Sequence, residues 1–208
     1  MIARFERTGA ATILCLVLAL AGTSAWGDDT TTETIVFIRH GEKPDNGLGQ
    51  LNCQGLNRAL ALPAVIAKNF GKPDAIFAPN PSVQKIDDGE AYDYVRPLAT
   101  VEPAAIAFGL PVNTQFGLAD VNGLQDSFEQ ARYRNAFILV AWEHKYIEAI
   151  ARAVLAAHAA DPGLVPAWKG HDFDSIYVIT IARTGNATTA TFAHKQEGLD
   201  GQPTACPR

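Results

Sequence analysis

The chain has 208 residues, of which 48% are hydrophobic and 19% are charged, and its formal net charge is −5. This length and hydrophobic content are sufficient for one globular domain with a sizeable core. An acidic chain is poorly suited to nucleic acid as its main partner, although a few cations that converge locally can still bind an anion.

The first residues have the pattern of an export signal. Arg4 and Arg7 precede a nearly unbroken apolar run over residues 10–22, which is followed by small residues of the kind that a signal peptidase recognises. The run is short for a transmembrane helix, which needs ~20 apolar residues. We therefore predict a signal peptide over residues 1–27 and a single mature domain over 28–208, periplasmic or secreted and free of the membrane after cleavage. An uncleaved N-terminal anchor is the alternative.

Two cysteines, Cys53 and Cys206, would remain in the exported protein. An oxidising compartment permits a disulfide between them, which would tie the C-terminal tail back to the domain. Two free buried thiols are the alternative that the sequence leaves open.

The first half of the chain alternates strand and helix signals. A polar lead-in over residues 28–33 precedes a short apolar run, Ile35–Ile38, that predicts a buried strand. Asn52 is a good N-cap for a helix over residues 53–70, which we expect Pro63 to kink or shorten.

Strand and helix signals continue along the rest of the chain. We expect a strand over 74–78, a polar loop insertion over 82–94, a helix over 96–108 that Pro103 interrupts and Gly109 ends, a short helix near 124–133, a strand over 136–142 with an amphipathic helix directly after it, and two strands over 175–181 and 187–194 joined by a hairpin turn at Gly185. This order predicts an α/β fold with a mainly parallel sheet and an antiparallel edge.

Two of the predicted strands end in charged and imidazole side chains. Arg39-His40-Gly41 follows the first strand, and Glu143-His144 follows the strand over 136–142. Because the carboxyl ends of parallel strands lie at one edge of the sheet, His40 and His144 would face one crevice if these strands are neighbours. An exposed strand end with solvated side chains is the alternative explanation for Arg39 and His40.

Two further arginines lie near predicted helix starts, where backbone N–H groups add partial positive charge. Arg96 begins one helix, and Arg58 lies near the start of another. Several arginine forks and two imidazoles around one crevice suit a dianionic phosphate. Taken by itself, Arg58 is better explained as a solvated helix charge.

These motifs together resemble the histidine phosphatase superfamily, with its phosphoglycerate mutase-like fold, over residues 34–194. The resemblance rests on Arg39-His40-Gly41-Glu42, on Asn52-x-x-Gly55-x-x-Arg58-Ala59, on Arg96 with Thr100 and Glu102-Pro103, and on His144 after its strand. It implies a three-layer fold, with helices on both faces of the sheet.

The resemblance also implies a set of roles. His40 would be the nucleophile and form a phosphohistidine, while Arg39, Arg96 and His144 hold the phosphoryl group. Three further residues, Arg58, Gly41 and Glu42, would contribute to substrate binding. The mechanism requires no metal or cofactor, and the expected partner is a small phosphorylated substrate.

The sequence departs from the family at the proton donor. Members often carry an acid directly after the second histidine, where this chain has Lys145, or in the region of Asp120, Asp126 and Glu129, which here matches no motif. Glu143 is the remaining candidate for the acid. The pair His171-Asp172 mimics a family motif but follows no buried strand, so we expect it to lie in a loop.

The leading hypothesis is an exported phosphomonoesterase. A phosphate-binding module that has lost turnover is an alternative from another class. A phosphate-moving mutase fits less well, because export separates the chain from glycolytic substrates.

Overall fold

The computed structural model describes Met1 and residues 30–208, so the predicted signal peptide over 1–27 falls outside the described part of the chain beyond its first residue. In sheet order, the strands of the main sheet are β5 (Val112–Asn113), β2 (Ala75–Phe77), β6 (Phe137–Trp142), β1 (Thr30–Arg39), β7 (Ser175–Thr184) and β8 (Ala187–Gln196). The helices are α1 (Cys53–Asn69), α2 (Arg96–Phe108), α3 (Val121–Phe128) and α4 (His144–Ala157), with 3-10 turns at Ala131–Tyr133 and Pro162–Leu164.

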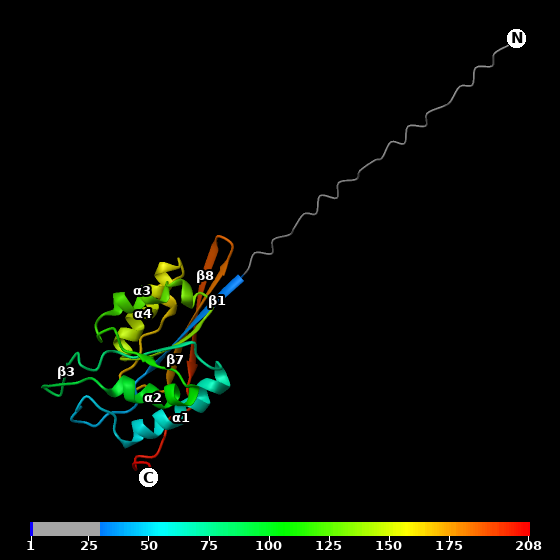
Figure 1. The fold of residues 1–208 in the computed structure, drawn as a ribbon. Helices are drawn as coiled ribbons and strands as arrows, with labels where there is room; N and C mark the ends of the chain where they lie inside the picture. Colours follow the sequence, from blue (N-terminus) through cyan, green and yellow to red (C-terminus); the bar gives the residue numbers. More distant parts are fainter. Residues whose placement is uncertain (2–29) are drawn as a thin grey trace.

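The predicted three-layer α/β fold is confirmed (Figure 1). Helices α3 and α4 cover one face of the sheet, and α1 and α2 cover the other. Because side chains alternate along a strand, Ile35 and Phe37 of β1 pack beneath α3 and α4, whereas Val36 and Ile38 pack beneath α1 and α2. The two cores thus lie on opposite faces of one sheet.

The directions of the strands bring two sequence motifs together. Strand β1 is parallel to β6, with Arg39 opposite Trp142, and antiparallel to β7. The His40 N–H donates to the Trp142 carbonyl over 3.1 Å, so His40 and the Glu143-His144 pair lie side by side where both strands end.

Several predicted boundaries were wrong for identifiable reasons. Strand β1 begins at Thr30, inside the predicted lead-in, because β7 extends far enough to pair with it. Helices α1 and α2 run through Pro63 and Pro103, held by buried faces against the sheet. Helix α3 begins at Val121 because the Asp120 carboxylate accepts from Gly123 N–H and caps it.

The predicted loop over residues 82–94 contains a separate hairpin, which we call the insert hairpin, made of β3 (Lys85–Asp87) and β4 (Glu90–Tyr92). It projects from the side of the molecule at which β1 ends (Figure 1). The insert hairpin is therefore close to the carboxyl ends of β1 and β6.

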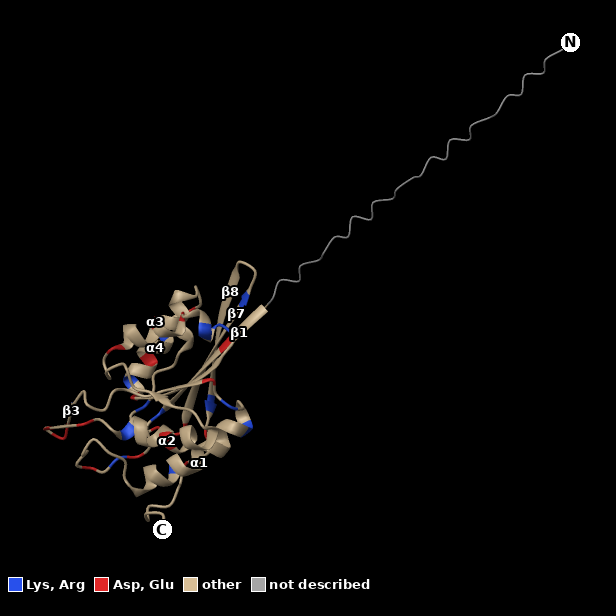
Figure 2. Ribbon diagram, viewed as in Figure 1, with Lys and Arg blue, Asp and Glu red and all other residues tan. Residues whose placement is uncertain are grey.

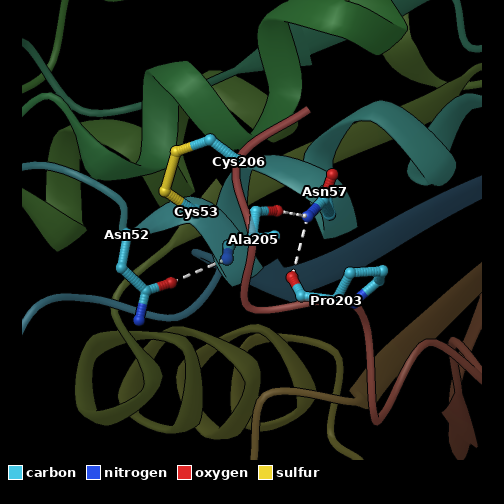
Figure 3. The surroundings of a disulfide bond; sticks show 7 residues. Asn52, Cys53, Asn57, Pro203, Ala205 and Cys206 are labelled. Carbon is cyan, nitrogen blue, oxygen red and sulfur yellow. Dashed lines mark hydrogen bonds between the residues drawn. A yellow bond between two sulfur atoms is a disulfide. The ribbon is translucent and has the colours of Figure 1, made fainter. Parts of the chain in front are cut away.

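The predicted disulfide between Cys53 and Cys206 is confirmed (Figure 3). It joins the C-terminal tail to the first turn of α1, where the Asn57 side-chain amide donates to the carbonyls of Pro203 and Ala205 over 2.7 and 2.8 Å. Among the described residues, no helix is both long and apolar enough to span a bilayer.

Candidate active site

Two aromatic rings flank His40, and each of them carries an arginine. The imidazole lies 6.0 Å from the Tyr94 ring and 6.1 Å from the Phe173 ring, measured between centroids. The Arg39 guanidinium carbon is 3.8 Å from the centroid of Phe173, and that of Arg96 is 4.7 Å from the centroid of Tyr94. Cation–π contact of this kind stabilises a buried guanidinium without occupying its N–H donors.

The surroundings of His40 keep its ring neutral and leave one nitrogen free. Nδ1 lies 2.7 Å from the Gly41 carbonyl, an acceptor, so Nδ1 carries the proton. Burial lowers the pKa of His40 well below 6.5, and the charges of Arg39 and Arg96 lower it further. The hydrogen bond to Gly41 and the charge of Glu143 raise the pKa but do not outweigh burial. Among the described residues, Nε2 has no hydrogen-bond partner, so its lone pair is available.

The two arginines are held through one end of the guanidinium. Arg39 Nη1 donates to the carbonyls of Gly170 and Asp172 over 2.8 and 2.7 Å. Arg96 Nη1 donates to the Gly47 carbonyl over 3.2 Å and to the Asp87 carboxylate of the insert hairpin. Burial lowers the pKa of Arg39 to about 10, which leaves it charged near neutral pH.

Several buried polar atoms around His40 have no partner within the described chain. They include Nε of Arg39 and Nε of Arg96, both enclosed from solvent; the Tyr94 hydroxyl is also enclosed and lies close to Arg96. An unsatisfied buried donor costs about 1–3 kcal/mol. The accessible donors are Nη2 of Arg39 and Nη2 of Arg96, which have no partner among the described residues and are not enclosed, so an oxyanion could accept from both.

Helix α4 places His144 at the same edge. Its N-cap is Glu143, whose carboxylate accepts from Lys145 N–H over 3.1 Å. His144 Nδ1 lies 2.9 Å from Glu143 Oε1, a close contact whose angle is unsuited to a hydrogen bond. The other ring nitrogen of His144, Nε2, is close to Gly170: a methyl group added to the Gly170 Cα would lie 4.0 Å from it. The Gly170 carbonyl accepts from Arg39.

Glu143 is ionised in this setting. Burial raises its pKa, but contact with His144, together with Lys85 and the Lys145 N–H, outweighs burial and brings the pKa to about 2. A carboxylate with this pKa holds no proton near neutral pH. The charge state therefore does not support the proton-donor role predicted for Glu143.

The predicted glycine motif explains how the loop after β1 reaches α1. A methyl group on Gly41 would lie 2.9 Å from the Gly55 Cα, and one on Gly55 would lie 2.3 Å from the Glu42 carbonyl oxygen. Gly41 N–H donates to the Thr100 hydroxyl over 2.9 Å, and that hydroxyl donates to the Arg96 carbonyl over 2.9 Å. Gly41 thus fixes backbone geometry between His40 and the start of α2.

Arg58 lies apart from these groups, contrary to the substrate-binding role expected for it. Its fully buried guanidinium binds four carboxylates at 2.7–3.1 Å, which we call the carboxylate cage: Glu42, Asp174, Glu197 and Asp200. The cage joins α1, the loop after β1 and the C-terminal tail. Glu42, also predicted to bind substrate, directs its carboxylate to Arg58.

The other acids considered in the sequence have local roles. Asp120 caps α3, and Glu129 pairs with His158 at 2.9 Å. Asp126 is an exposed residue of α3. The pair His171-Asp172 lies in a turn, as predicted, and the Asp172 carboxylate accepts from Ser175.

Sequence reasoning missed four residues of the site. Tyr94 and Phe173 lie beside the His40 ring, Lys85 lies over the Tyr94 ring, and Asp87 binds Arg96. They come from the insert hairpin, from the residues directly after it, or from the loop before β7, outside the elements that periodicity identifies. Figure 2 shows basic residues at the end of α2 nearest the insert hairpin and acidic residues at the hairpin tip. This pairing of opposite charges is the one signal that could have placed the insert beside Arg96.

Other parts of the described chain offer less chemistry. A cavity of about 400 Å³ lies at the amino ends of β2 and β5, lined by residues such as Asp74, Val112 and Arg132, on the opposite side of the sheet from His40. The described residues contain no cluster of three or more histidine, cysteine or acidic side chains arranged to hold a metal.

Neither a protein-family model nor a curated protein sequence matches the chain. Solved structures do match its fold. A candidate phosphohistidine phosphatase, SixA from Nakamurella multipartitia, is 14% identical with a TM-score of 0.52, over 79% of this chain and 95% of that one. A mycobacterial glucosyl-3-phosphoglycerate phosphatase in complex with inorganic phosphate is 15% identical with a TM-score of 0.50, over 77% and 95%. These likenesses establish a shared fold.

The carboxylate cage generates a stability prediction. Arg58→Ala should lower the free energy of unfolding by about 3–5 kcal/mol, because it leaves buried carboxylates without a counter-charge. Urea denaturation measures the loss. As a control, Arg152→Ala, which removes a partly exposed pair with Glu148 at 3.1 Å, should cost less than about 1 kcal/mol. A similarly small loss for Arg58→Ala would contradict a structural role.

The neutral state of His40 generates a pH prediction. NMR of histidine-labelled protein should find that the His40 ring takes up its proton only well below the ordinary histidine pKa of 6.5. Because the unfolded chain takes up this proton and the folded chain does not, His40 should reduce stability as the pH falls below 6.5. His40→Asn identifies the resonance. A protonation midpoint at or above 6.5 would contradict the burial argument.

Proposed function

We propose that this chain is a phosphatase of the histidine phosphatase type, which hydrolyses a phosphomonoester through a phosphohistidine on His40. The observation that carries the proposal is the pair of guanidinium nitrogens without a partner among the described residues, Arg39 Nη2 and Arg96 Nη2, near a neutral histidine with a free Nε2. The shared fold with structures described as phosphatases agrees with this assignment.

In the first step, the lone pair of His40 Nε2 attacks phosphorus, and the bond from phosphorus to the leaving oxygen breaks. The ring gains positive charge as the new bond forms, and the Gly41 carbonyl that accepts from Nδ1 stabilises that charge. Arg39 and Arg96 donate to the non-bridging oxygens, where negative charge concentrates in the transition state.

In the second step, water attacks the phosphohistidine and releases inorganic phosphate, which restores the neutral ring. His144, at the positive end of α4, adds a further contact on the Arg39 side of the phosphoryl group. A small phosphorylated substrate is the partner that these groups fit. Arg58 and Glu42 act through structure, by joining α1 to the loop that carries His40.

The test is the hydrolysis of nitrophenyl phosphate by purified protein. His40→Ala should reduce kcat/KM at least ~1,000-fold, since it removes the nucleophile. His158→Ala, whose ring pairs with Glu129 away from the site, should retain activity. Rapid quenching should trap an acid-labile phosphate on wild type and not on His40→Ala. Undiminished activity of His40→Ala would overturn the mechanism, and phosphate binding without turnover would favour a binding module.

We also propose that the protein is exported to the periplasm or secreted. The signal-like sequence over residues 1–27 and the disulfide between Cys53 and Cys206 support this, since disulfides persist in oxidising compartments. Sequencing of the protein recovered from the native cell envelope or medium should give an N-terminus close to residue 28. A full-length chain with reduced cysteines in the cytosol would contradict export.

A further inference from the structure

Lys85 is a cation beside the site to which the two steps above give no role. Its Nζ lies 4.8 Å from the centroid of the Tyr94 ring. The same ring carries the Arg96 guanidinium carbon at 4.7 Å and meets the His40 imidazole edge to face at 6.0 Å. His40, Arg96 and the Lys85 ammonium group thus all lie against one buried aromatic ring, that of Tyr94.

The insert hairpin fixes Lys85 in this place. Lys85 pairs with Tyr92 across the hairpin, and Asp87, two residues further along β3, binds Arg96 and lies 3.5 Å from Lys43 Nζ. Because residues two apart share one side of a strand, Lys85 and Asp87 both face the site. The Tyr94 N–H donates to the Pro81 carbonyl over 3.0 Å and closes the insert at its base.

The electrostatic surroundings of Lys85 favour release of its proton. The largest influence is burial, which lowers the pKa of the ammonium below its ordinary value of 10.5. Arg96 and Lys145 lower it further, while Glu143 and Asp87 oppose them. An ammonium group with a lowered pKa is a stronger acid than an exposed lysine and gives up its proton more readily.

The other groups around the Tyr94 ring are poor acids. Glu143, with a pKa of about 2, has already lost its proton. Burial raises the pKa of the Tyr94 hydroxyl above its usual range, which makes the hydroxyl a weaker acid. Arg96 does not transfer protons, since a guanidinium stays protonated in proteins. His144 lies on the Arg39 side, against Gly170.

We propose that Lys85 is the catalytic acid that protonates the leaving-group oxygen, an inference that rests on the phosphatase function proposed above. As the bond between His40 Nε2 and phosphorus forms, the electron pair of the breaking P–O bond stays on the leaving oxygen, which takes a proton from the Lys85 ammonium. The resulting amine then accepts a proton from the water that cleaves the phosphohistidine. That proton restores the ammonium, and inorganic phosphate then leaves.

The experiment compares phosphomonoesters whose leaving groups differ in their need for a proton. Dinitrophenyl phosphate needs none, whereas an alkyl phosphate does. Lys85→Met should reduce kcat/KM for the alkyl phosphate at least ~100-fold and for dinitrophenyl phosphate less than ~5-fold. Lys85→Arg keeps the charge but cannot donate, so it should show the same selective loss.

A pH profile adds a second readout. With the alkyl phosphate, the basic limb of kcat/KM should be present in wild type and absent from Lys85→Met. Lys68→Met, which removes an exposed lysine in the last turn of α1, is the matched control and should show neither change. Thermal unfolding of each variant verifies that it is folded.

Three results would overturn the role of Lys85: an equal loss for both substrates, rescue by Lys85→Arg, or no loss with the alkyl phosphate. Each of these leaves the phosphohistidine mechanism intact if His40→Ala, measured in parallel, is inactive. Activity of His40→Ala with dinitrophenyl phosphate would instead remove the phosphohistidine step and the Lys85 role together.

Discussion

The burial of two arginines beside a histidine is the constraint on which the site depends. A buried cation costs several kcal/mol unless its charge and its donors are compensated. Here carbonyl groups of the loop before β7 and one carboxylate of the insert hairpin compensate the Nη1 atoms of Arg39 and Arg96. Their Nη2 atoms remain without partners among the described residues, which leaves donors for an oxyanion beside His40.

Arg58 shows how the same chain treats an arginine with a structural role. Four carboxylates surround its guanidinium, and every nitrogen of the group has a partner. The contrast in partners separates two arginines that are equally buried: Arg58 is neutralised by the protein, whereas Arg96 retains nitrogens without a partner among the described residues. Burial alone would not have distinguished them.

The sequence was sufficient for the parts of the site that follow regular elements. Arg39 and His40 end a strongly apolar strand, Arg96 begins a helix, and Glu143-His144 joins a buried strand to a helix, so hydrophobic periodicity placed all of them at one edge. Thr100 and the Gly41–Gly55 contact were present in the motifs, although their function in packing required coordinates.

The remainder depends on long-range contacts that periodicity does not encode. Tyr94 and Phe173 reach His40 from loops, and the pairing of Asp87 with Arg96 decides where the insert hairpin lies. Arg58 was placed on the correct helix, but its partners Glu197 and Asp200 lie in the C-terminal tail. The sequence suggested the disulfide that anchors this tail, but it did not show where the tail lies in the fold.

The central claim is that the unpartnered donors form a cradle for one oxyanion at His40, and a crystal structure with orthovanadate tests it most directly. We expect vanadium next to His40 Nε2, with vanadate oxygens accepting from Nη2 of Arg39 and Nη2 of Arg96, and the Arg58 cage unchanged. Vanadate bound elsewhere, with these donors still unpartnered or turned away from His40, would contradict the account.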